Sequence, residues 1–286
     1  MFTKIRNFLS LSKKNDYPNF MIIGAQKAGT TALYEYLSRH PQIQATREKE
    51  LHYFNCETRY KHGIKFYRSF FKLNENLKLT FDASPGYLNS TSAPKRIYTH
   101  NPNVKIIILL RDPVERAYSA WNMYKKRYMD NRSWFFDQWI SYCGNGGITF
   151  FRRTDDRLYD FMLYAKDEIE FNSVNKSSDM LEAPILSHGF YYDQIQKYLS
   201  LFNKKQILIL ENSEMRTNTI KCLKKIEAFL DISCCDWESE SLTPVFEGEY
   251  SAQVDLSATR YLRDYYRSSN ERLFNYLGKR YDWDVE

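Results

Sequence analysis

The sequence predicts an α/β domain in which a parallel sheet is flanked on both sides by helices, giving three layers. Three observations predict it. Short apolar runs alternate with amphipathic segments along most of the 286 residues. The runs 104–110 (VKIIILL) and 206–210 (QILIL) are continuous, which is typical of strands buried on both faces of a parallel sheet. A glycine-bounded loop joins the first apolar run to the first helix, so we expect a P-loop-like domain.

The expected elements follow one another in a strand–helix alternation. Strands are expected at residues 20–23, 43–45, 51–54, 77–82, 104–110 and 206–210. Helices are expected from Thr30, and at residues 62–71, 94–100, 113–128, 189–202, 218–230 and 256–277. Residues 83–86 (ASPG) predict a turn, and residues 130–184 predict loops and short helices. No repeat or linker divides the chain, so we expect one domain over residues 19–286 after a flexible basic leader, residues 1–18.

Composition and charge narrow the classes of function. The net charge of +6 is compatible with anionic ligands, but basic and acidic residues are interspersed and do not indicate nucleic-acid binding. The five cysteines show no C-x-x-C pair, so no metal site is expected. No stretch approaches the roughly 20 apolar residues of a membrane span, and we expect a cytoplasmic protein. An amphipathic pattern within residues 2–9 leaves peripheral membrane contact open, and the oligomeric state is open too.

The segment from Gly24 to Thr31 (GAQKAGTT) is the most informative motif. A loop that opens onto a helix directs unpaired N–H groups and the positive end of the helix dipole at one point, where a phosphate binds. The spacing approaches the P-loop pattern G-x-x-x-x-G-K-[ST], but the lysine stands inside the loop and a threonine follows the second glycine. We therefore expect a phosphoanhydride, without a γ-phosphate and magnesium, to be bound by Gln26, Lys27, Ala28, Gly29, Thr30 and Thr31.

A second candidate anion site follows the strand at 104–110. Ligands bind at the carboxyl ends of parallel strands, and Arg111 stands at this end. Its guanidinium suits phosphate oxygens, and Ser119 lies about two helical turns further on. We expect Arg111 and Ser119 to hold a second phosphate. The alternative is that Arg111 pairs with Asp112 or Glu115 as a structural clamp.

Glu50 and His52 are candidates for acid–base chemistry. If residues 51–54 are extended, Glu50, His52 and Phe54 share one face, because side chains alternate along a strand. A carboxylate beside an imidazole can act as a general base with its partner. A Glu-x-His pair in a charged turn is also common as solvated surface, so the pair alone leaves both readings open.

Together these motifs resemble the sulfotransferases that use 3′-phosphoadenosine 5′-phosphosulfate (PAPS), most nearly the heparan-sulfate-type carbohydrate branch and its bacterial relatives. Residues 24–31 are similar to the family's 5′-phosphosulfate loop, residues 111–119 to its 3′-phosphate motif, and residues 50–54 to its Glu-x-His-aromatic-Phe segment. The resemblance extends from Phe20 to Trp283. It implies transfer of a sulfuryl group from PAPS to a hydroxyl of a glycan or glycolipid, with PAP as product and no required metal.

The resemblance also implies roles for individual residues. Glu50 corresponds to the catalytic base, with His52 as the alternative base that the small-molecule branch uses, and Lys27 to the cation that neutralises the leaving phosphate oxygen. The branch often ends its nucleotide site with a Lys-Gly-Arg loop, which residues 246–251 (FEGEYS) replace, so Tyr250 is the expected additional contact. The turn at 82–87 (DASPGY) lacks a lysine that the branch often carries, and Asn55 stands where an aspartate is frequent.

Three alternatives remain open on the sequence. A P-loop kinase or NTPase would need a lysine at position 30 and an aspartate for magnesium after a hydrophobic strand. A nucleotide- or glycan-binding relative without catalysis would not need both Lys27 and Glu50. A sulfotransferase that acts on a small-molecule or peptide tyrosine hydroxyl would carry the same two phosphate motifs.

Overall fold

A parallel sheet forms the centre of the computed structural model, which describes residues 18–71, 79–133, 159–174, 184–240, 242 and 255–283. Five strands lie in the order β2-β3-β1-β4-β5. They are β1 (Phe20–Gly24), β2 (Ile43–Ala45), β3 (Leu79–Ala83), β4 (Lys105–Leu110) and β5 (Ile207–Glu211). Tyr250 and the predicted leader, apart from Pro18, lie outside the described residues. The predicted parallel sheet flanked by helices is confirmed.

The strands β1 and β4 are apolar apart from Lys105, the first residue of β4, because both of their faces are covered. Residues 20–23 of β1 and residues 106–110 of β4 have no exposed surface. Their register runs from Phe20 opposite Lys105 to Gly24 opposite Ile108, with an irregularity before Gly24. The chain leaves β1 toward β2 but leaves β4 toward the opposite edge. The sheet therefore has its topological switch point between β1 and β4, where ligands bind in folds of this type.

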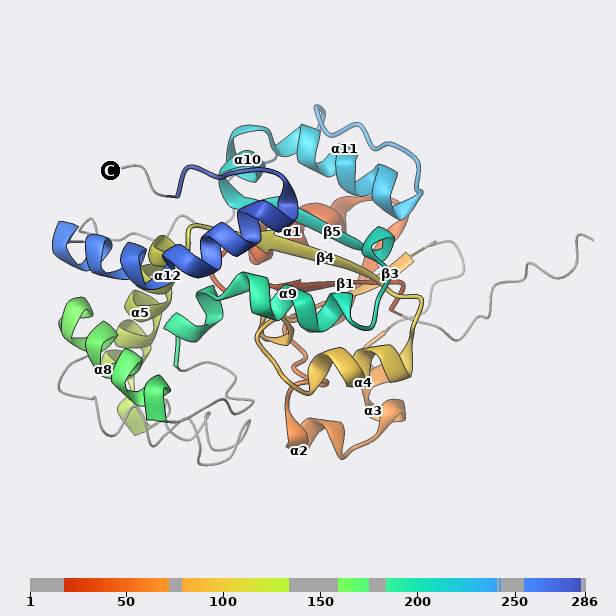
Figure 1. Ribbon diagram of the computed structural model, residues 1–286. Coiled ribbons are helices and arrows are strands. Elements are labelled where there is room, and N and C mark those ends of the chain that lie inside the picture. The colour runs from red at the N-terminus through yellow and green to blue at the C-terminus, as the bar shows by residue number, and fades with distance from the viewer. Residues whose placement is uncertain are drawn as a thin grey trace, which may run out of the picture.

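Helices cover both faces of the sheet (Figure 1). Figure 1 shows α1, α10 and α11 on one side and α4 and α9 on the other. The helices are α1 (Thr30–Arg39), α2 (Glu57–Tyr60), α3 (Ile64–Arg68), α4 (Ala93–His100), α5 (Pro113–Asp130), α8 (Phe161–Val174), α9 (Tyr191–Leu199), α10 (Asn212–Thr217), α11 (Thr219–Leu230) and α12 (Leu256–Leu277), with 3-10 helices η1 (Pro85–Tyr87), η3 (Leu186–Gly189) and η4 (Lys204–Gln206). No helix within the described residues has the length and apolar character that crossing a bilayer requires.

A second apolar cluster packs α5 against α8 and α12 beside the sheet. It encloses the carboxylate of Glu168, which accepts the backbone N–H groups of Ile185 at 2.8 Å and Ser187 at 3.2 Å and so anchors η3 to α8. Burial raises the pKa of Glu168 to about 7, although these N–H groups favour the charged form. The Tyr191 hydroxyl then donates to the carbonyl of Arg111 at 2.8 Å, which fixes the chain where β4 ends.

Two predicted elements differ from the structure. Residues 51–54 are not a strand, because Glu50 and His52 have φ of 62° and 48°, which strand residues do not adopt. The helix predicted at 62–71 is only Ile64–Arg68, and the shorter α2 precedes it. Gly63 separates the two helices with φ of 78°, a left-handed value that suits glycine and ends a regular helix.

Candidate functional site

The phosphate loop, residues 24–31, continues directly from β1 into α1. The Ala25 N–H donates to the Leu109 carbonyl at 2.7 Å, which ties the loop to β4, and the Ala28 N–H closes a turn on the Ala25 carbonyl at 3.2 Å. Gly29 precedes the first helical residue with φ of 94°. Thr30 is buried and Thr31 is half-buried in the first turn of α1. The predicted strand–loop–helix geometry is therefore present.

Two side chains from neighbouring strand ends hold the carbonyl groups of this loop. Arg111 follows β4, and its Nη1 donates to the Lys27 carbonyl at 3.2 Å. Asn212 follows β5, and its Nδ2 donates to the Ala28 carbonyl at 2.8 Å. Because the C=O and N–H of a trans peptide point in opposite directions, the second bond directs the Gly29 N–H away from Asn212. Asn212 was absent from the sequence prediction, although its place directly after a buried strand could have indicated it.

Gly29 leaves no room for a side chain at this point. A Cβ atom there would lie 2.8 Å from Asn212 Nδ2, and the left-handed φ adds backbone strain for any other residue. Gly24 is equally confined, because its Cβ would lie 2.6 Å from the Cβ of Leu88. Close packing therefore requires both glycines of the motif, and the left-handed φ is a second requirement at Gly29 only.

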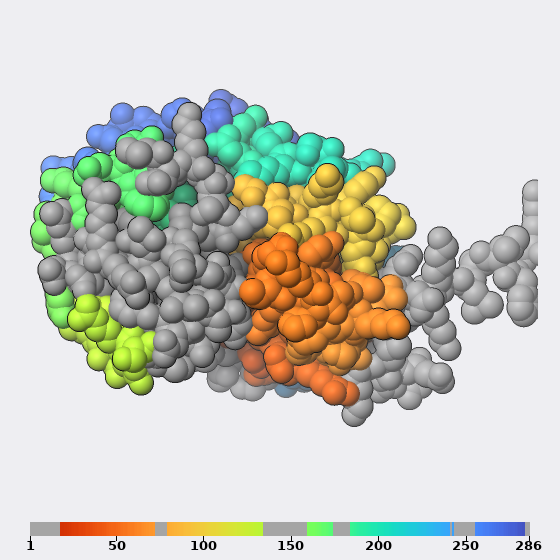
Figure 2. Space-filling view, turned by 90° about the horizontal axis from the view of Figure 1, so that it is seen from below, coloured from red at the N-terminus to blue at the C-terminus, as the bar shows by residue number. Residues whose placement is uncertain are grey.

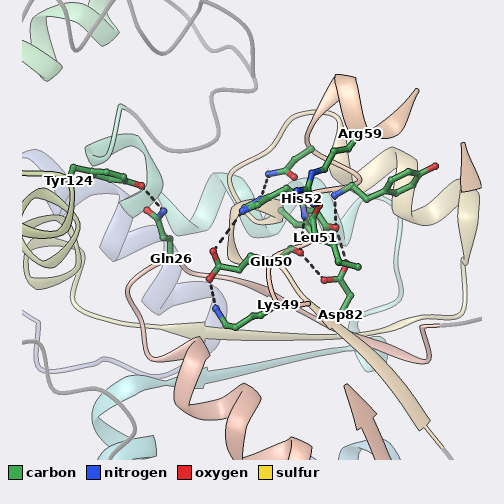
Figure 3. Close-up of polar contacts among 12 residues, drawn as sticks. Gln26, Lys49, Glu50, Leu51, His52, Arg59, Asp82 and Tyr124 are labelled. Atoms are coloured by element: carbon green, nitrogen blue, oxygen red, sulfur yellow. Dashed lines mark hydrogen bonds and ion pairs between the residues drawn. The ribbon is translucent and has the colours of Figure 1, made fainter. Parts of the chain in front are cut away.

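Gln26 connects the phosphate loop to α5. Its Nε2 donates to the hydroxyl of Tyr124 at 2.7 Å, as Figure 3 shows. Its Oε1 is buried and has no hydrogen-bond partner among the described residues. A buried acceptor of this kind suits a ligand that brings a donor group.

Arg111 pairs with Glu115, as the structural-clamp alternative predicts, and also contacts the phosphate loop. Its Nε and Nη2 each lie 3.1 Å from Oε2 of Glu115, one turn further along α5. Asp112 instead caps α5 by accepting the N–H groups of Val114 and Glu115 at 2.7 and 3.2 Å. Ser119 lies on the same helix and is only 3% exposed. Arg111 thus contacts both the phosphate loop and α5 and already shares its charge with Glu115, and its binding of a second phosphate stays a prediction.

The base loop, residues 50–53, lies at the end of the neighbouring strand β3, where the Glu50 N–H donates to the Ala83 carbonyl at 3.0 Å. The close-up in Figure 3 shows Glu50 beside His52 and on the same side of the sheet as Gln26. His52 Nε2 lies 3.8 Å from Glu50 Oε2, which is an electrostatic contact rather than a close hydrogen bond. Glu50 and His52 therefore lie side by side, as predicted. Their left-handed backbone angles bring them together, and the predicted alternation along a strand is not the cause.

Phe54, which the extended reading placed on the face of Glu50, points into the core. The centroid of its ring lies 4.8 Å from that of Tyr67 and 5.7 Å from that of Tyr87, and Phe54 has no exposed surface. This part of the chain, orange in Figure 2, lies against the yellow segment that contains α4. The aromatic packing anchors the base loop while Glu50 stays at the surface.

The carboxylate of Glu50 is held in its charged form. Its burial raises the pKa, but the His52 imidazole and the Lys49 ammonium outweigh that effect and lower the pKa to about 2. Lys49 Nζ bonds directly to Glu50 Oε1, and the Glu50 side chain is 44% exposed, against 12% for His52. The turn at 82–87 lacks the family's lysine, and Lys49 supplies a cation at this carboxylate instead.

Asn55 contacts the other nitrogen of the imidazole. Its Nδ2 lies 3.5 Å from His52 Nδ1, and its Oδ1 is buried without a hydrogen-bond partner in the described part of the chain. If the Asn55 amide donates to Nδ1, the ring proton stands on Nε2 and faces Glu50. An asparagine can therefore orient the histidine at the position where the family frequently has aspartate.

No three His, Cys, Asp or Glu side chains of the described residues converge on a point that could hold a metal ion. The expectation that the reaction requires no metal stays a prediction. The candidate site therefore combines the phosphate loop, Arg111 and the base loop, which follow β1, β4 and β2, with Ser119 further along α5.

Comparison with known proteins assigns the family. The model of the sulfotransferase domain family matches residues 17–275, and the chain belongs to this family. It is 28% identical to the membrane-associated sulfotransferase kil1 of Dictyostelium discoideum over 93% of its length, and 27% identical to human bifunctional heparan sulfate N-deacetylase/N-sulfotransferase 1 over 92%. The crystal structure of a sulfotransferase from Alicyclobacillus acidocaldarius shares the fold, with a TM-score of 0.65, 23% identity, and coverage of 93% of this chain and 98% of that one.

These relatives confirm the predicted sulfotransferase domain and correct one prediction. The matched regions span 66% of kil1 and 30% of the human protein, so the chain corresponds to only part of each. The prediction of a cytoplasmic protein is wrong, because the relatives include a sulfotransferase that is named as membrane-associated. That prediction used the lack of a long apolar segment, which peripheral membrane attachment does not need.

Proposed function

We propose that this sulfotransferase-family chain transfers the sulfuryl group of PAPS to a hydroxyl of a carbohydrate. The observation that carries the proposal is the placement of an anion-binding loop and a charged carboxylate at the carboxyl ends of the neighbouring strands β1 and β3. The heparan sulfate relatives support a carbohydrate acceptor. Membrane contact and the oligomeric state stay outside the proposal.

The residues present fit a donor with two separated phosphate groups. Gly29 opens the loop at the N-terminus of α1, so its N–H and those of Thr30 and Thr31 suit the 5′-phosphosulfate. Arg111 and Ser119 suit the 3′-phosphate, for which Glu115 competes at the guanidinium. PAPS would supply an activated sulfuryl group whose bond to the phosphate oxygen is the one that breaks.

In the proposed reaction, Glu50 removes the proton of the acceptor hydroxyl. The acceptor oxygen forms its bond to sulfur as the sulfur–oxygen bond to the 5′-phosphate breaks, and the electron pair of that bond passes to the phosphate oxygen. Lys27 and the N–H groups of the phosphate loop neutralise the charge that develops there. Glu50 is ionised at neutral pH, so its carboxylate can accept the proton, which then passes to solvent.

The test is transfer of isotope-labelled sulfate from PAPS to a panel of acceptors. The panel contains N-desulfated and O-desulfated heparan sulfate, a simple glycoside, p-nitrophenol and a tyrosine peptide. We expect incorporation into O-desulfated chains. Labelling only of free amino groups would show that the acceptor group is an amine and not a hydroxyl, in line with the names of the N-sulfotransferase relatives. Labelling only of phenol or tyrosine would contradict the carbohydrate acceptor.

Two substitutions test the assigned residues. Lys27→Ala and Glu50→Gln should each lower kcat about 100-fold or more, because each removes a group that acts at the developing charge or the transferred proton. Lys61→Ala is the control, since Lys61 is 73% exposed and pairs only with surface Glu57 at 3.8 Å among the contacts described. Unchanged turnover in Glu50→Gln would remove Glu50 from the reaction.

A further inference from the structure

The base loop adopts a conformation that its own residues do not favour. Glu50 and His52 both have left-handed φ, which is strained for residues other than glycine. The loop is held from outside by the segment at the end of β3. The His52 N–H donates to Ser84 Oγ at 3.3 Å, and the Tyr53 N–H donates to the Tyr87 hydroxyl at 3.1 Å.

Both of these hydroxyl groups converge on one buried carboxylate. Asp82 has no exposed surface, and its Oδ1 accepts the Ser84 hydroxyl at 2.8 Å while its Oδ2 accepts the Tyr87 hydroxyl at 2.9 Å. The Tyr67 hydroxyl also donates to Oδ2, at 3.0 Å. Figure 3 shows Asp82 beside the base loop.

The carboxylate sets the direction of the hydrogen bonds. A hydroxyl has one proton, and an ionised carboxylate can only accept. The hydroxyls of Ser84 and Tyr87 therefore donate to Asp82. Their oxygens then accept hydrogen bonds from the N–H groups of His52 and Tyr53. An amide at position 82 would place a donor in this network, and at least one hydroxyl would have to reverse.

The turn that carries these hydroxyls approaches the imidazole closely. A Cβ atom on Gly86 would lie 2.8 Å from Asn55 Nδ2 and 3.4 Å from His52 Cε1. A shift of the turn is therefore transmitted directly to His52 and, through its contact with Glu50, to the proposed base.

We propose that Asp82 is a positioning residue that holds Glu50 and His52 in their reactive geometry through the hydroxyls of Ser84 and Tyr87. This inference rests on the proposed function, in which Glu50 is the base. Misplacement of a reacting group by about 1 Å can lower turnover about 100-fold, so a network at this position controls the rate without touching the substrate.

The network serves geometry at the expense of stability. Burial raises the pKa of Asp82, and the hydroxyl groups of Ser84, Tyr87 and Tyr67 only partly offset this effect. The ionised carboxylate is therefore less stable in the folded protein than in water, so its burial by itself contributes nothing to stability. A carboxylate retained only for stability would have a lowered pKa in the folded protein.

The experiment measures kcat, the KM for PAPS and the affinity for PAP in four variants. Asp82→Asn, Ser84→Ala and Tyr87→Phe should lower kcat by about 10- to 100-fold, with the KM for PAPS and the PAP affinity changed less than about twofold. Tyr67→Phe is the matched control. It removes a hydrogen bond to the same carboxylate from a buried core residue, but no base-loop N–H bonds to its hydroxyl, so kcat should change less than about twofold.

Two results would overturn the proposal. One is a loss of kcat in Tyr67→Phe equal to that in Ser84→Ala, and the other is a parallel loss of PAP affinity, since both indicate damage to the core. If Asp82→Asn does not bind PAP, Ser84→Ala and Tyr87→Phe decide. Glu50→Gln in the same assay separates failure of the proposed function from failure of the positioning role. Full turnover in Glu50→Gln overturns the proposed function. If Glu50→Gln loses turnover but Asp82→Asn and Ser84→Ala keep full turnover, only the positioning role is overturned.

Discussion

The phosphate loop and the base loop lie at the carboxyl ends of neighbouring strands, and both contain left-handed residues other than glycine. Lys27 has φ of 64° in the first, and Glu50 and His52 have φ of 62° and 48° in the second. The phosphate loop runs from β1 into α1, so regular structure holds both of its ends. The base loop follows β2 without a helix of its own, and side chains from other parts of the chain hold it.

This difference separates a loop that its adjacent strand and helix hold at both ends, with Arg111 and Asn212 as further supports, from a loop that distant side chains hold. In the phosphate loop, the close packing at Gly24 and Gly29 accounts for both glycines of the motif. In the base loop, neither Glu50 nor His52 favours its own backbone angle, and the contacts with β3, Tyr87 and Arg59 compensate. Substitutions should therefore damage the first loop through its own glycines and the second through residues far from it in sequence.

The largest effect is expected for Gly29→Ala in the phosphate loop. Left-handed strain of about 1–2 kcal/mol adds to the contact of the new Cβ with Asn212. We expect PAP affinity to fall by about 100-fold in calorimetric titration. Gly63→Ala is the control, because Gly63 has φ of 78° but nothing within 4 Å of its Cβ position, and it should bind PAP normally. Equal losses in both variants would mean that strain alone is responsible.

Arg59→Ala should damage the base loop without affecting the donor. Arg59 Nη1 donates to the carbonyl of Leu51, between Glu50 and His52, at 2.5 Å. Losing this charge-assisted bond should lower kcat about 10-fold through the position of Glu50, with PAP affinity unchanged. The measurement is steady-state kinetics beside PAP titration. Weaker PAP binding with normal kcat would show that the two loops are not independent.

Asn212→Ala should produce the opposite pattern, with a smaller amplitude. It removes the donor at the Ala28 carbonyl and frees the peptide that directs the Gly29 N–H. We expect the KM for PAPS to rise about fivefold, the worth of about one neutral hydrogen bond, with little change in kcat. Asn103→Ala, at an exposed position, is the control. A fall in kcat at constant KM would instead assign Asn212 to the chemical step.

The smallest effect at neutral pH is expected for Lys49→Gln. Lys49 helps to lower the pKa of Glu50 to about 2, so its removal should raise that pKa toward the ordinary value for glutamate. Glu50 must be ionised to act as a base, and activity is lost as pH falls through its pKa. The acid limb of kcat/KM should therefore move to higher pH, measured from about pH 3 to about pH 7. Superimposable profiles would show that Glu50 does not control this limb, and exposed Lys65→Gln serves as the control.

Much of the fold follows from local patterns. The short extended segment at residues 43–45 and the periodicity at 256–277 predict β2 and α12 with the bounds that the structure has. Helix ends elsewhere differ by a few residues, as in α9, because terminal turns depend on their neighbours. The short α2 and α10 were missed, since four to six residues carry little periodic signal.

The sequence by itself determined the order of strands and helices and the two strand ends proposed to bind anions, because each depends on residues that are adjacent in the chain. Only the tertiary structure decided the geometry of the base loop and the contributions of Asp82 and Asn212. The bonds responsible join residues 32, 34 and 184 positions apart: His52 to Ser84, Tyr53 to Tyr87, and Asn212 to Ala28. No local pattern specifies such pairs, since they form only when the sheet brings the ends of β1, β3 and β5 to one edge.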